Sequence, residues 1–349
     1  MKPENNGKTA AKGVGLIPRV NRFANRLGLD WFLLALLLMI VLAYLWPQIG
    51  VKDGPLALGT ITDVGVSVIF LFYGLRLSPE KLKAGLSNWR LHLLVQLSTF
   101  VLFPVLILLL MQVVSADSSN LLWLGVFYLA ALPSTVSSSV VMVSVAGGNM
   151  PGAIFNASIS SLLGVFITPL WMGVFLSAGS GTMDMQEVML KLVVQVLVPV
   201  IVGILLHSRL GAFAERYKAR IRFFDQTIIL LIVYSSFCES YARNLFGGLS
   251  MLHLVGLGAA MLALFFLIYG IITGISRLLN LTWEDKITAV FCGSKKSLVH
   301  GTVMSKVLFP DANVVGVVLL PIMIYHALQL VVASIIAQAA ARKAAARQL

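Results

Sequence analysis

Residues 291–310, FCGSKKSLVHGTVMSKVLFP, place a polar cluster in the middle of an apolar segment that is long enough to cross a bilayer. An ammonium group at mid-membrane depth costs about 2.5–3.5 kcal/mol on insertion scales, so such groups face a cavity or a partner and are usually functional. Glycine and serine beside the lysines predict a broken helix, whose freed backbone groups can bind a substrate or an ion. The polar members of the cluster are Gly293, Ser294, Lys295, Lys296, Ser297 and His300.

A second interpretation of the same stretch is a loop that holds both lysines in water. Apolar residues resume on both sides of the cluster without turn residues, which favours the membrane helix.

The composition is typical of an integral membrane protein. Of the 349 residues, 58% are hydrophobic and only 11% are charged, whereas soluble domains carry about 25% charged residues. Apolar runs of about 20 residues recur, which favours helices over the alternating strands of a barrel. Cys238 and Cys292 both lie in apolar runs, so we expect no disulfide framework, no thiolate metal cluster and no cofactor.

We predict an all-α protein with ten membrane-spanning helices. Their approximate ranges are 31–46, 57–75, 89–114, 121–145, 152–176, 188–206, 224–242, 252–275, 287–309 and 314–338. A basic N-terminal segment (1–29) precedes them and a tail (339–349) follows them.

The distribution of basic residues predicts the orientation of these helices. With both termini cytoplasmic, 20 of the 26 lysines and arginines lie on the cytoplasmic side, and only Lys52, Lys191, Arg243 and Lys306 lie opposite. Asp117 and Asp184 then fall in outward-facing loops. The net charge of +12 is thereby explained by topology and by contact with membrane lipids, and no nucleic-acid partner is expected.

The second half of the chain resembles the first at an offset of about 162 residues. Asp63 pairs with Asp225 in this comparison, and Pro133 pairs with Lys295. Five helices per repeat place the two halves, 30–176 and 186–338, in opposite orientations. Inverted repeats with interrupted helices at corresponding positions indicate the central site of a secondary transporter.

The predicted fourth helix contains the counterpart of the lysine cluster, LPSTVSSSVVMVSVAGGNMPG (132–152). Pro133 removes a backbone donor and kinks the helix. Five hydroxyls follow it, which can satisfy freed backbone groups or coordinate a cation. Any one of these serines also suits simple helix packing. The hydroxyl residues are Ser134, Thr135, Ser137, Ser138 and Ser139, and the fifth helix adds Asn156.

No enzyme motif is present in the sequence. A Walker loop is missing, which argues against a self-contained ATP-driven pump, and the run GSKKS lacks the upstream glycine spacing of a phosphate loop. No paired-histidine metalloprotease motif occurs. We therefore do not expect an enzyme.

Four stretches together resemble the bile acid:sodium symporter family, most closely an orphan bacterial branch of it. They are WRLHLLVQLSTFVLFP (89–104), ALPSTVSSSVV (131–141), AGGNMPGAIFNASISSLLG (146–164) and FCGSKKSLVHG (291–301). The resemblance covers residues 31–338 and implies a symporter in the bacterial inner membrane. It also implies a panel of helices 1, 2, 6 and 7, and a core of helices 3–5 and 8–10, in which the interrupted fourth and ninth helices cross.

The same resemblance implies a sodium site at the crossing, which this sequence does not reproduce. Phe291 stands where the family's sodium-binding glutamate is expected, and Lys295 and Lys296 stand where a glutamine and an asparagine are expected. Lysine donates three hydrogen bonds and accepts none, so it cannot coordinate sodium. Sodium coupling is therefore doubtful, and a sodium ion or a proton remains open as the coupling ion.

The leading hypothesis is a secondary transporter of a small organic anion that works by alternating access. In one version a lysine ammonium replaces the sodium ion and pairs with the serine hydroxyls. In another it binds the anion directly, or titrates and couples transport to protons. The alternatives are a non-transporting membrane regulator or scaffold that retains the fold and, third, a channel; the oligomeric state is left open.

The predicted substrate or ion site combines both polar clusters. Two ammonium groups a few Å apart in a dry site oppose each other, so one lysine is expected to face water or substrate, with Lys295 favoured. The site residues are Ser134, Thr135, Ser137, Ser138, Ser139, Asn156, Ser294, Lys295, Lys296, Ser297 and His300.

Overall fold

The computed structural model describes residues 31–51, 54–56, 58–76, 88–116, 120–178, 190–191, 193–247, 250–309 and 311–345. All regular structure within these ranges is helical, as predicted. The basic segment 1–29, the aspartates Asp117 and Asp184 and residues 346–349 lie outside the described residues. The predicted orientation of the termini therefore stays a prediction.

Seven helical stretches of the described chain are long and apolar enough to cross a membrane. They are Leu58–Leu75, Trp89–Val113, Met150–Leu176, Val193–Arg216, Lys218–Ala242, Met251–Leu278 and Asn313–Lys343. The protein is thus an all-helical, multi-pass membrane protein.

Three of the ten predicted spans differ from these long helices. The first is α2 (Trp31–Leu45), whose 15 residues extend for about 22 Å. The fourth is divided into α8 (Leu121–Ala131) and α9 (Ser137–Val145), and the ninth into α15 (Trp283–Gly293) and α16 (Leu298–Leu308). Both interruptions fall where the sequence predicts them, while the number of membrane crossings stays a prediction.

The remaining elements are single helices or helices with a wider turn inside them. They are α3 (Pro47–Gly50), α4 (Leu58–Leu75), α6 (Trp89–Leu97), the π-turn η1 (Ser98–Leu102), α7 (Phe103–Val113), α10 (Met150–Ala178), the π-turn η2 (Val193–Leu197), α12 (Val198–Arg216), α13 (Lys218–Ala242), α14 (Met251–Leu278) and α17 (Ala312–Ala345).

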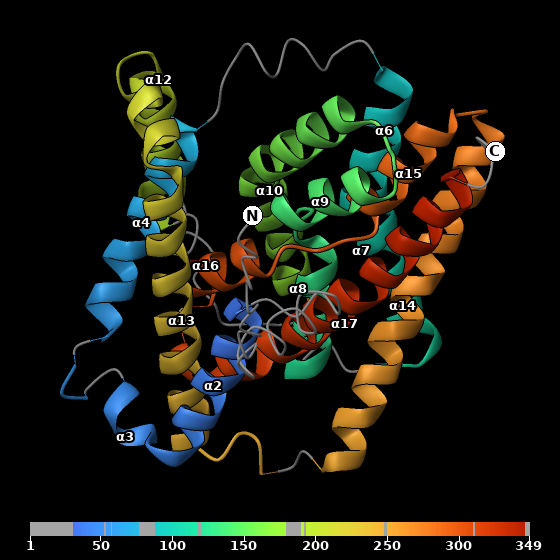
Figure 1. The fold of residues 1–349 in the computed structure, drawn as a ribbon. Helices are drawn as coiled ribbons and strands as arrows, with labels where there is room; N and C mark the ends of the chain where they lie inside the picture. The colour runs from blue at the N-terminus through green and yellow to red at the C-terminus, as the bar shows by residue number, and fades with distance from the viewer. Residues whose placement is uncertain are drawn as a thin grey trace, which may run out of the picture.

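The helices form two groups with α8, α9 and α16 between them (Figure 1). On one side α4 packs along α12 and α13, and α2 packs along α13. On the other side α14 packs against α15 and α17, and α15 packs against α6. Helix α17 also contacts α8 and α13, so it joins the two groups.

Glycine explains the close approach of α4 and α12. A Cβ atom at Gly74 would collide with the carbonyl oxygen of Val200, and one at Gly203 would collide with that of Leu71. Small residues allow membrane helices to pack at short backbone distances, and this pair therefore holds α4 tightly on α12.

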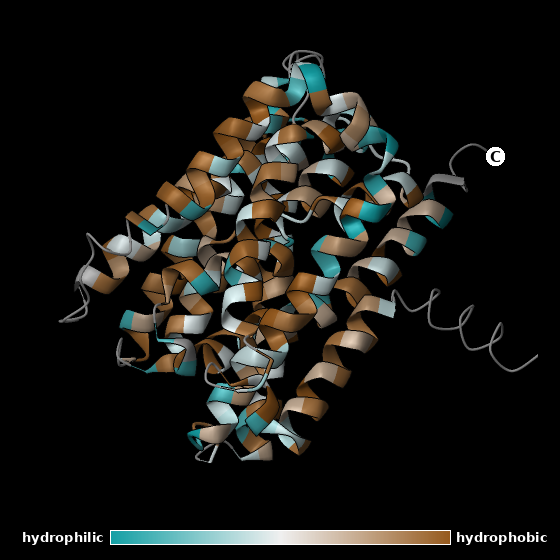
Figure 2. Ribbon diagram, turned by 90° about the vertical axis from the view of Figure 1, so that its left-hand side faces the viewer, coloured by the Kyte–Doolittle hydropathy of each residue, from teal (hydrophilic) through white to brown (hydrophobic). Residues whose placement is uncertain are grey.

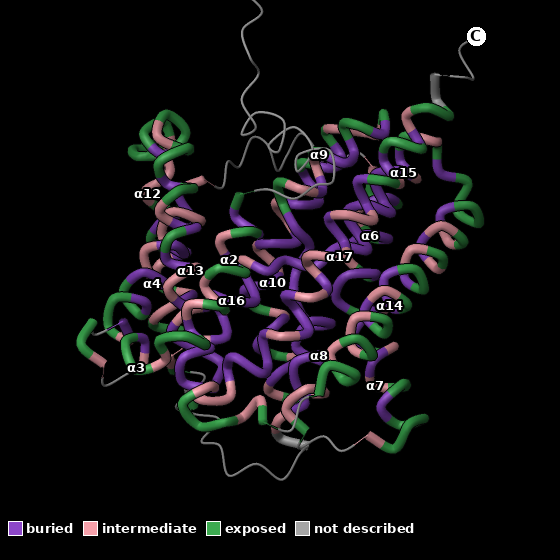
Figure 3. Tube along the Cα trace, turned by 60° about the horizontal axis from the view of Figure 1, so that its bottom comes forward, coloured by how far each residue is buried: buried purple, intermediate pink, exposed green. Residues whose placement is uncertain are grey.

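Hydropathy and burial agree with a membrane environment. Hydrophobic residues cover most of the helix surfaces in Figure 2, with hydrophilic residues frequent at the ends of the bundle and in its middle. The outer helices α12 and α14 are largely exposed in Figure 3. Only 17% of the membrane window of Val193–Arg216 is buried, against 61% for Asn313–Lys343, so α12 lies at the surface of the bundle and α17 is central.

The predicted sixth and seventh spans, 188–206 and 224–242, leave a basic connecting loop at 207–223, and this prediction is wrong because the segment is almost entirely helical. Helix α12 continues to Arg216 and α13 begins at Lys218. The guanidinium groups of Arg216 and Arg220 lie 5.8 and 5.4 Å from the ring centre of Tyr217. Basic residues indicate where a helix leaves the hydrocarbon layer, but they do not end the helix. A segment rich in good helix formers remains helical as it passes into the headgroup region.

Candidate functional site

The first interruption, between α8 and α9, exposes backbone groups that other helices satisfy. Pro133 has no N–H, so α8 cannot continue through it. The N–H of Ser134 donates to Ser160 Oγ of α10 at 3.0 Å, and the carbonyl of Pro133 accepts from the N–H of Ser297 at 2.9 Å. Buried backbone groups require such partners, so the break is part of the native packing.

The second interruption, between α15 and α16, is held by α17 and by its own cap. The hydroxyl of Tyr325 donates to the carbonyl of Ser294 at 2.7 Å. Ser297 is the N-cap of α16, where its Oγ accepts from the N–H of His300 at 3.3 Å. Residues 294–297 therefore have a defined, non-helical path through the middle of the protein.

The two interruptions touch each other. Besides the bond from Ser297 to Pro133, the Oγ of Ser134 donates to the carbonyl of Cys292 at 2.5 Å, and the Oγ of Ser139 donates to that of Phe291 at 3.0 Å. Both serines are fully buried. Their hydroxyls satisfy carbonyls at the C-terminal end of α15, where a helix leaves its last acceptors without donors.

The ammonium of Lys296 is the most heavily bonded group at this crossing. Its Nζ donates to the carbonyl oxygens of Thr99, Ala130 and Leu132 at 2.7, 2.7 and 2.8 Å. It also lies 4.1 Å from the ring centre of Phe103. Three carbonyls at hydrogen-bond distance require three N–H donors, which only the protonated amine supplies. Lys296 is therefore a buried cation with all of its donors used.

Lys295 is equally buried but differently placed. Its exposed fraction is 0%, against 1% for Lys296, and its Nζ has no hydrogen-bond partner. Neither lysine faces water in this conformation, and the alternative that one of them faces substrate stays a prediction. Burying an amine without an acceptor costs free energy, and an anionic ligand would supply the missing acceptor.

The predicted hydroxyl cluster divides into inner and outer members. Thr135 Oγ1 lies 2.7 Å from Ser139 Oγ and accepts from Ser138 Oγ at 2.9 Å. Ser138 is half-buried and Ser137 is exposed, so these two are turned away from the contact with α15. The serine pairing of the lysine expected from the sequence is not observed, because Lys296 binds main-chain carbonyls.

The other two predicted residues lie beside the crossing. Asn156 on α10 accepts from Gln96 Nε2 at 3.2 Å, and its Nδ2 lies 2.9 Å from His92 Nδ1, so it binds α6. His300 lies 3.0 Å from Ser297 Oγ through Nδ1, and its ring meets that of Tyr73 on α4 edge-on at 5.6 Å.

Several residues that shape the site were missed by the sequence interpretation. Gln329 binds both backbone groups of Lys296, accepting from its N–H at 2.9 Å and donating to its carbonyl at 2.8 Å. Thr168 donates to the carbonyl of Ala131 at 2.8 Å, and Tyr128 donates to that of Gly301 at 2.7 Å. A glutamine in an apolar helix was a usable signal for Gln329, whereas threonine and tyrosine are common there.

An open groove of about 480 Å³ lies elsewhere, between α4 and α12, and none of the predicted site residues lines it. Its wall is mostly apolar and includes Asp63, Ser67 and Gln195. Within the described ranges, no three His, Cys, Asp or Glu side chains gather to hold a metal ion. The chemistry of the crossing is therefore that of hydroxyls, carbonyls and two amines.

Comparison with known proteins places this chain in a class of membrane transporters. Residues 30–342 match the family described as "SBF-like CPA transporter family (DUF4137)". The chain belongs to this family, and its relatives connect it with the bile acid:sodium symporters, as the four sequence stretches indicated.

Three relatives show how far the similarity extends. Protein PA2026 of Pseudomonas aeruginosa is 41% identical over 90% of this chain and 93% of its own length. The Escherichia coli (strain K12) protein named "Putative symporter YfeH" is 37% identical over 89% of this chain and 92% of its own. "Sodium/bile acid cotransporter 7" of Danio rerio is 33% identical over 93% of this chain and 95% of its own length.

Proposed function

We propose that this protein is a secondary transporter that moves a small organic anion across a bacterial inner membrane by alternating access. The observation that carries the proposal is the contact between two interrupted helices, where buried serines bind the carbonyls of α15 and two lysines lie out of water. Irregular backbone at membrane depth is tolerated where it is enclosed by protein or lines a path, and transporters place their sites there.

The anion is inferred from the two amines. Lys296 already has three acceptors, whereas Lys295 has none, so Lys295 is the group that gains most from a carboxylate or sulfate. The names of relatives such as "Sodium/bile acid cotransporter 7" support an organic anion as the substrate class. Lys296 supplies a fixed positive charge, so we propose transport without a sodium requirement.

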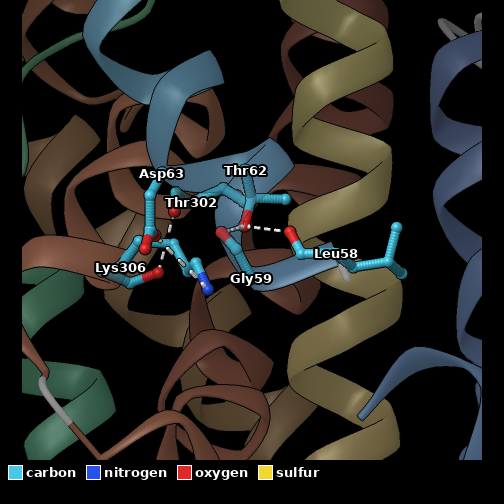
Figure 4. Close-up of polar contacts among 7 residues, drawn as sticks. Leu58, Gly59, Thr62, Asp63, Thr302 and Lys306 are labelled. Carbon is cyan, nitrogen blue, oxygen red and sulfur yellow. Dashed lines mark hydrogen bonds and ion pairs between the residues drawn. The ribbon is translucent and has the colours of Figure 1, made fainter. Parts of the chain in front are cut away.

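For alternating access, α2, α4, α12 and α13 form a panel that moves against a core of α6–α10 and α14–α17. The contacts of helix α4 with the core include an ion pair and a hydrogen bond. Asp63 and Lys306 of α16 face each other in Figure 4, with 3.8 Å between Oδ1 and Nζ. Near the other end of α4, Tyr73 donates to the carbonyl of Ser158 at 3.3 Å. Both contacts join panel to core, so both must break when the panel moves. The two five-helix halves are inverted repeats with both termini cytoplasmic.

The test is counterflow in proteoliposomes, after a thermal-shift screen of small metabolites has identified ligands. A transporter accumulates labelled anion against an internal pool of unlabelled anion, with a saturable rate. A channel would pass current in planar bilayers, and a regulator or scaffold that merely retains the fold would do neither. Either of these results would overturn the proposal.

A further inference from the structure

The three carbonyls that bind Lys296 are available because two prolines interrupt the local hydrogen-bond pattern. In η1 the N–H of Phe103 reaches back to the carbonyl of Ser98. The next donor in this wider pattern would come from Pro104, which has no N–H, so the Thr99 carbonyl is left free. Because Pro133 breaks α8, the carbonyls of Ala130 and Leu132 also lose their helical donors.

These carbonyls come from two distant segments and converge on one point. Thr99 belongs to the middle of the α6–η1–α7 stretch, and Ala130 and Leu132 to the end of α8, yet all three oxygens lie 2.7–2.8 Å from one nitrogen. The face of the Phe103 ring adds a fourth, electron-rich wall 4.1 Å away. Converging carbonyl oxygens are how proteins replace the hydration shell of a monovalent cation.

The backbone of Lys296 is fixed, so its side chain starts from one defined place, and the three carbonyls hold the ammonium at its far end. Gln329 binds its N–H and its carbonyl, and the neighbouring Ser297 N–H binds Pro133. The contrast with Lys295, which has no partner, shows that these acceptors are specific to one of two adjacent side chains.

We infer that the main chain around Thr99, Ala130 and Leu132 forms a cation-binding site that Lys296 permanently fills. Removing the side chain opens this site to a free primary alkylammonium or a small monovalent cation. The side chain thus stabilises the core as a bound ion does, and it is not a ligand of the substrate.

The experiment measures thermal stability in detergent, so it does not depend on transport. Lys296→Ala removes the equivalent of n-propylammonium. Lys296→Met keeps the apolar stem and leaves room only near the former Nζ. Melting is compared in choline chloride, n-propylammonium chloride, ammonium chloride, sodium chloride and potassium chloride, with the parent and Lys295→Ala as matched controls.

We expect both Lys296 variants to melt below the parent in choline. Propylammonium should raise the Tm of Lys296→Ala by about 5 °C, with a saturable dependence on concentration. Ammonium or an alkali cation should have the same effect on Lys296→Met. The parent and Lys295→Ala should show no such shift. An equal shift in all four proteins, or no shift in folded Lys296 variants, would overturn the inference. Failure of both variants to fold in every salt also counts against it, because the free cation would then not replace the ammonium.

Discussion

Lys295 and Lys296 are adjacent and equally buried, yet only the Lys296 ammonium has hydrogen-bond acceptors. Two like charges in a dry site oppose each other, and only the Lys296 amine has acceptors that stabilise its charge in this conformation. Lys296 therefore serves the structure, and Lys295 is the candidate ligand of the anion.

This division predicts opposite effects of Lys295→Met on stability and on transport. Methionine has a similar shape and no amine, so the variant avoids the free-energy cost of burying the Lys295 amine without an acceptor, which is about 1–3 kcal/mol. We expect an unchanged or higher Tm together with loss of counterflow, because the counter-charge for the anion is gone. Lys343→Met, at an exposed lysine near the end of α17, should change neither quantity. Counterflow at the parent rate in Lys295→Met would contradict the assigned role.

The hydroxyls of the first interruption stabilise the C-terminal end of helix α15. Ser134 and Ser139 bind the last carbonyls of α15, whereas Ser137 is exposed. Ser134→Ala leaves the Cys292 carbonyl buried without a donor, so we expect a loss of about 1–3 kcal/mol in stability. Ser137→Ala should stay within about 0.5 kcal/mol of the parent. Unfolding curves in denaturant check both values, and equal stability of the two variants would show that the Ser134 bond contributes nothing.

Helix α4 should move against α16 if the protein works by alternating access. Replacing both members of the ion pair, Asp63→Cys with Lys306→Cys, allows a bifunctional reagent to link the two helices. We expect the linked protein to bind ligand but not to complete counterflow.

The matched control is Tyr44→Cys with Tyr241→Cys. Their rings lie 5.5 Å apart on α2 and α13, both within the proposed panel. A link there should leave transport intact. Normal counterflow in the Asp63–Lys306 linked protein would show that this boundary does not move.

For the whole molecule, the fixed cation predicts the ion dependence of transport. A sodium-coupled carrier gains its driving force from an ion that binds and leaves, whereas the Lys296 ammonium is part of the chain and cannot leave with the substrate. Replacing sodium by potassium on both sides of proteoliposomes should change the initial rate less than about twofold, because both salts screen surface charges equally at the same ionic strength. A saturable dependence on sodium in the unmodified protein would restore the ordinary symporter interpretation.

The sequence alone determined the membrane class, the helical fold and the position of both interruptions. These features are local: hydropathy over about 20 residues selects a membrane helix, and Pro133 or the Gly293–Ser294 pair interrupts it wherever it is placed. Local signals failed at α12 and α13, where basic residues were interpreted as a loop although the helices continue.

Only the tertiary structure decided which polar groups meet. The acceptors of Lys296 lie 164 to 197 residues away in the chain, and two of the three depend on how the interrupted α8 is oriented. They are main-chain carbonyls, which carry no side-chain identity that a sequence pattern could display. Lys295 and Lys296 are therefore indistinguishable as residue types, and they differ because neighbouring residues in a non-helical segment point in different directions, one toward free carbonyls and the other away from any acceptor.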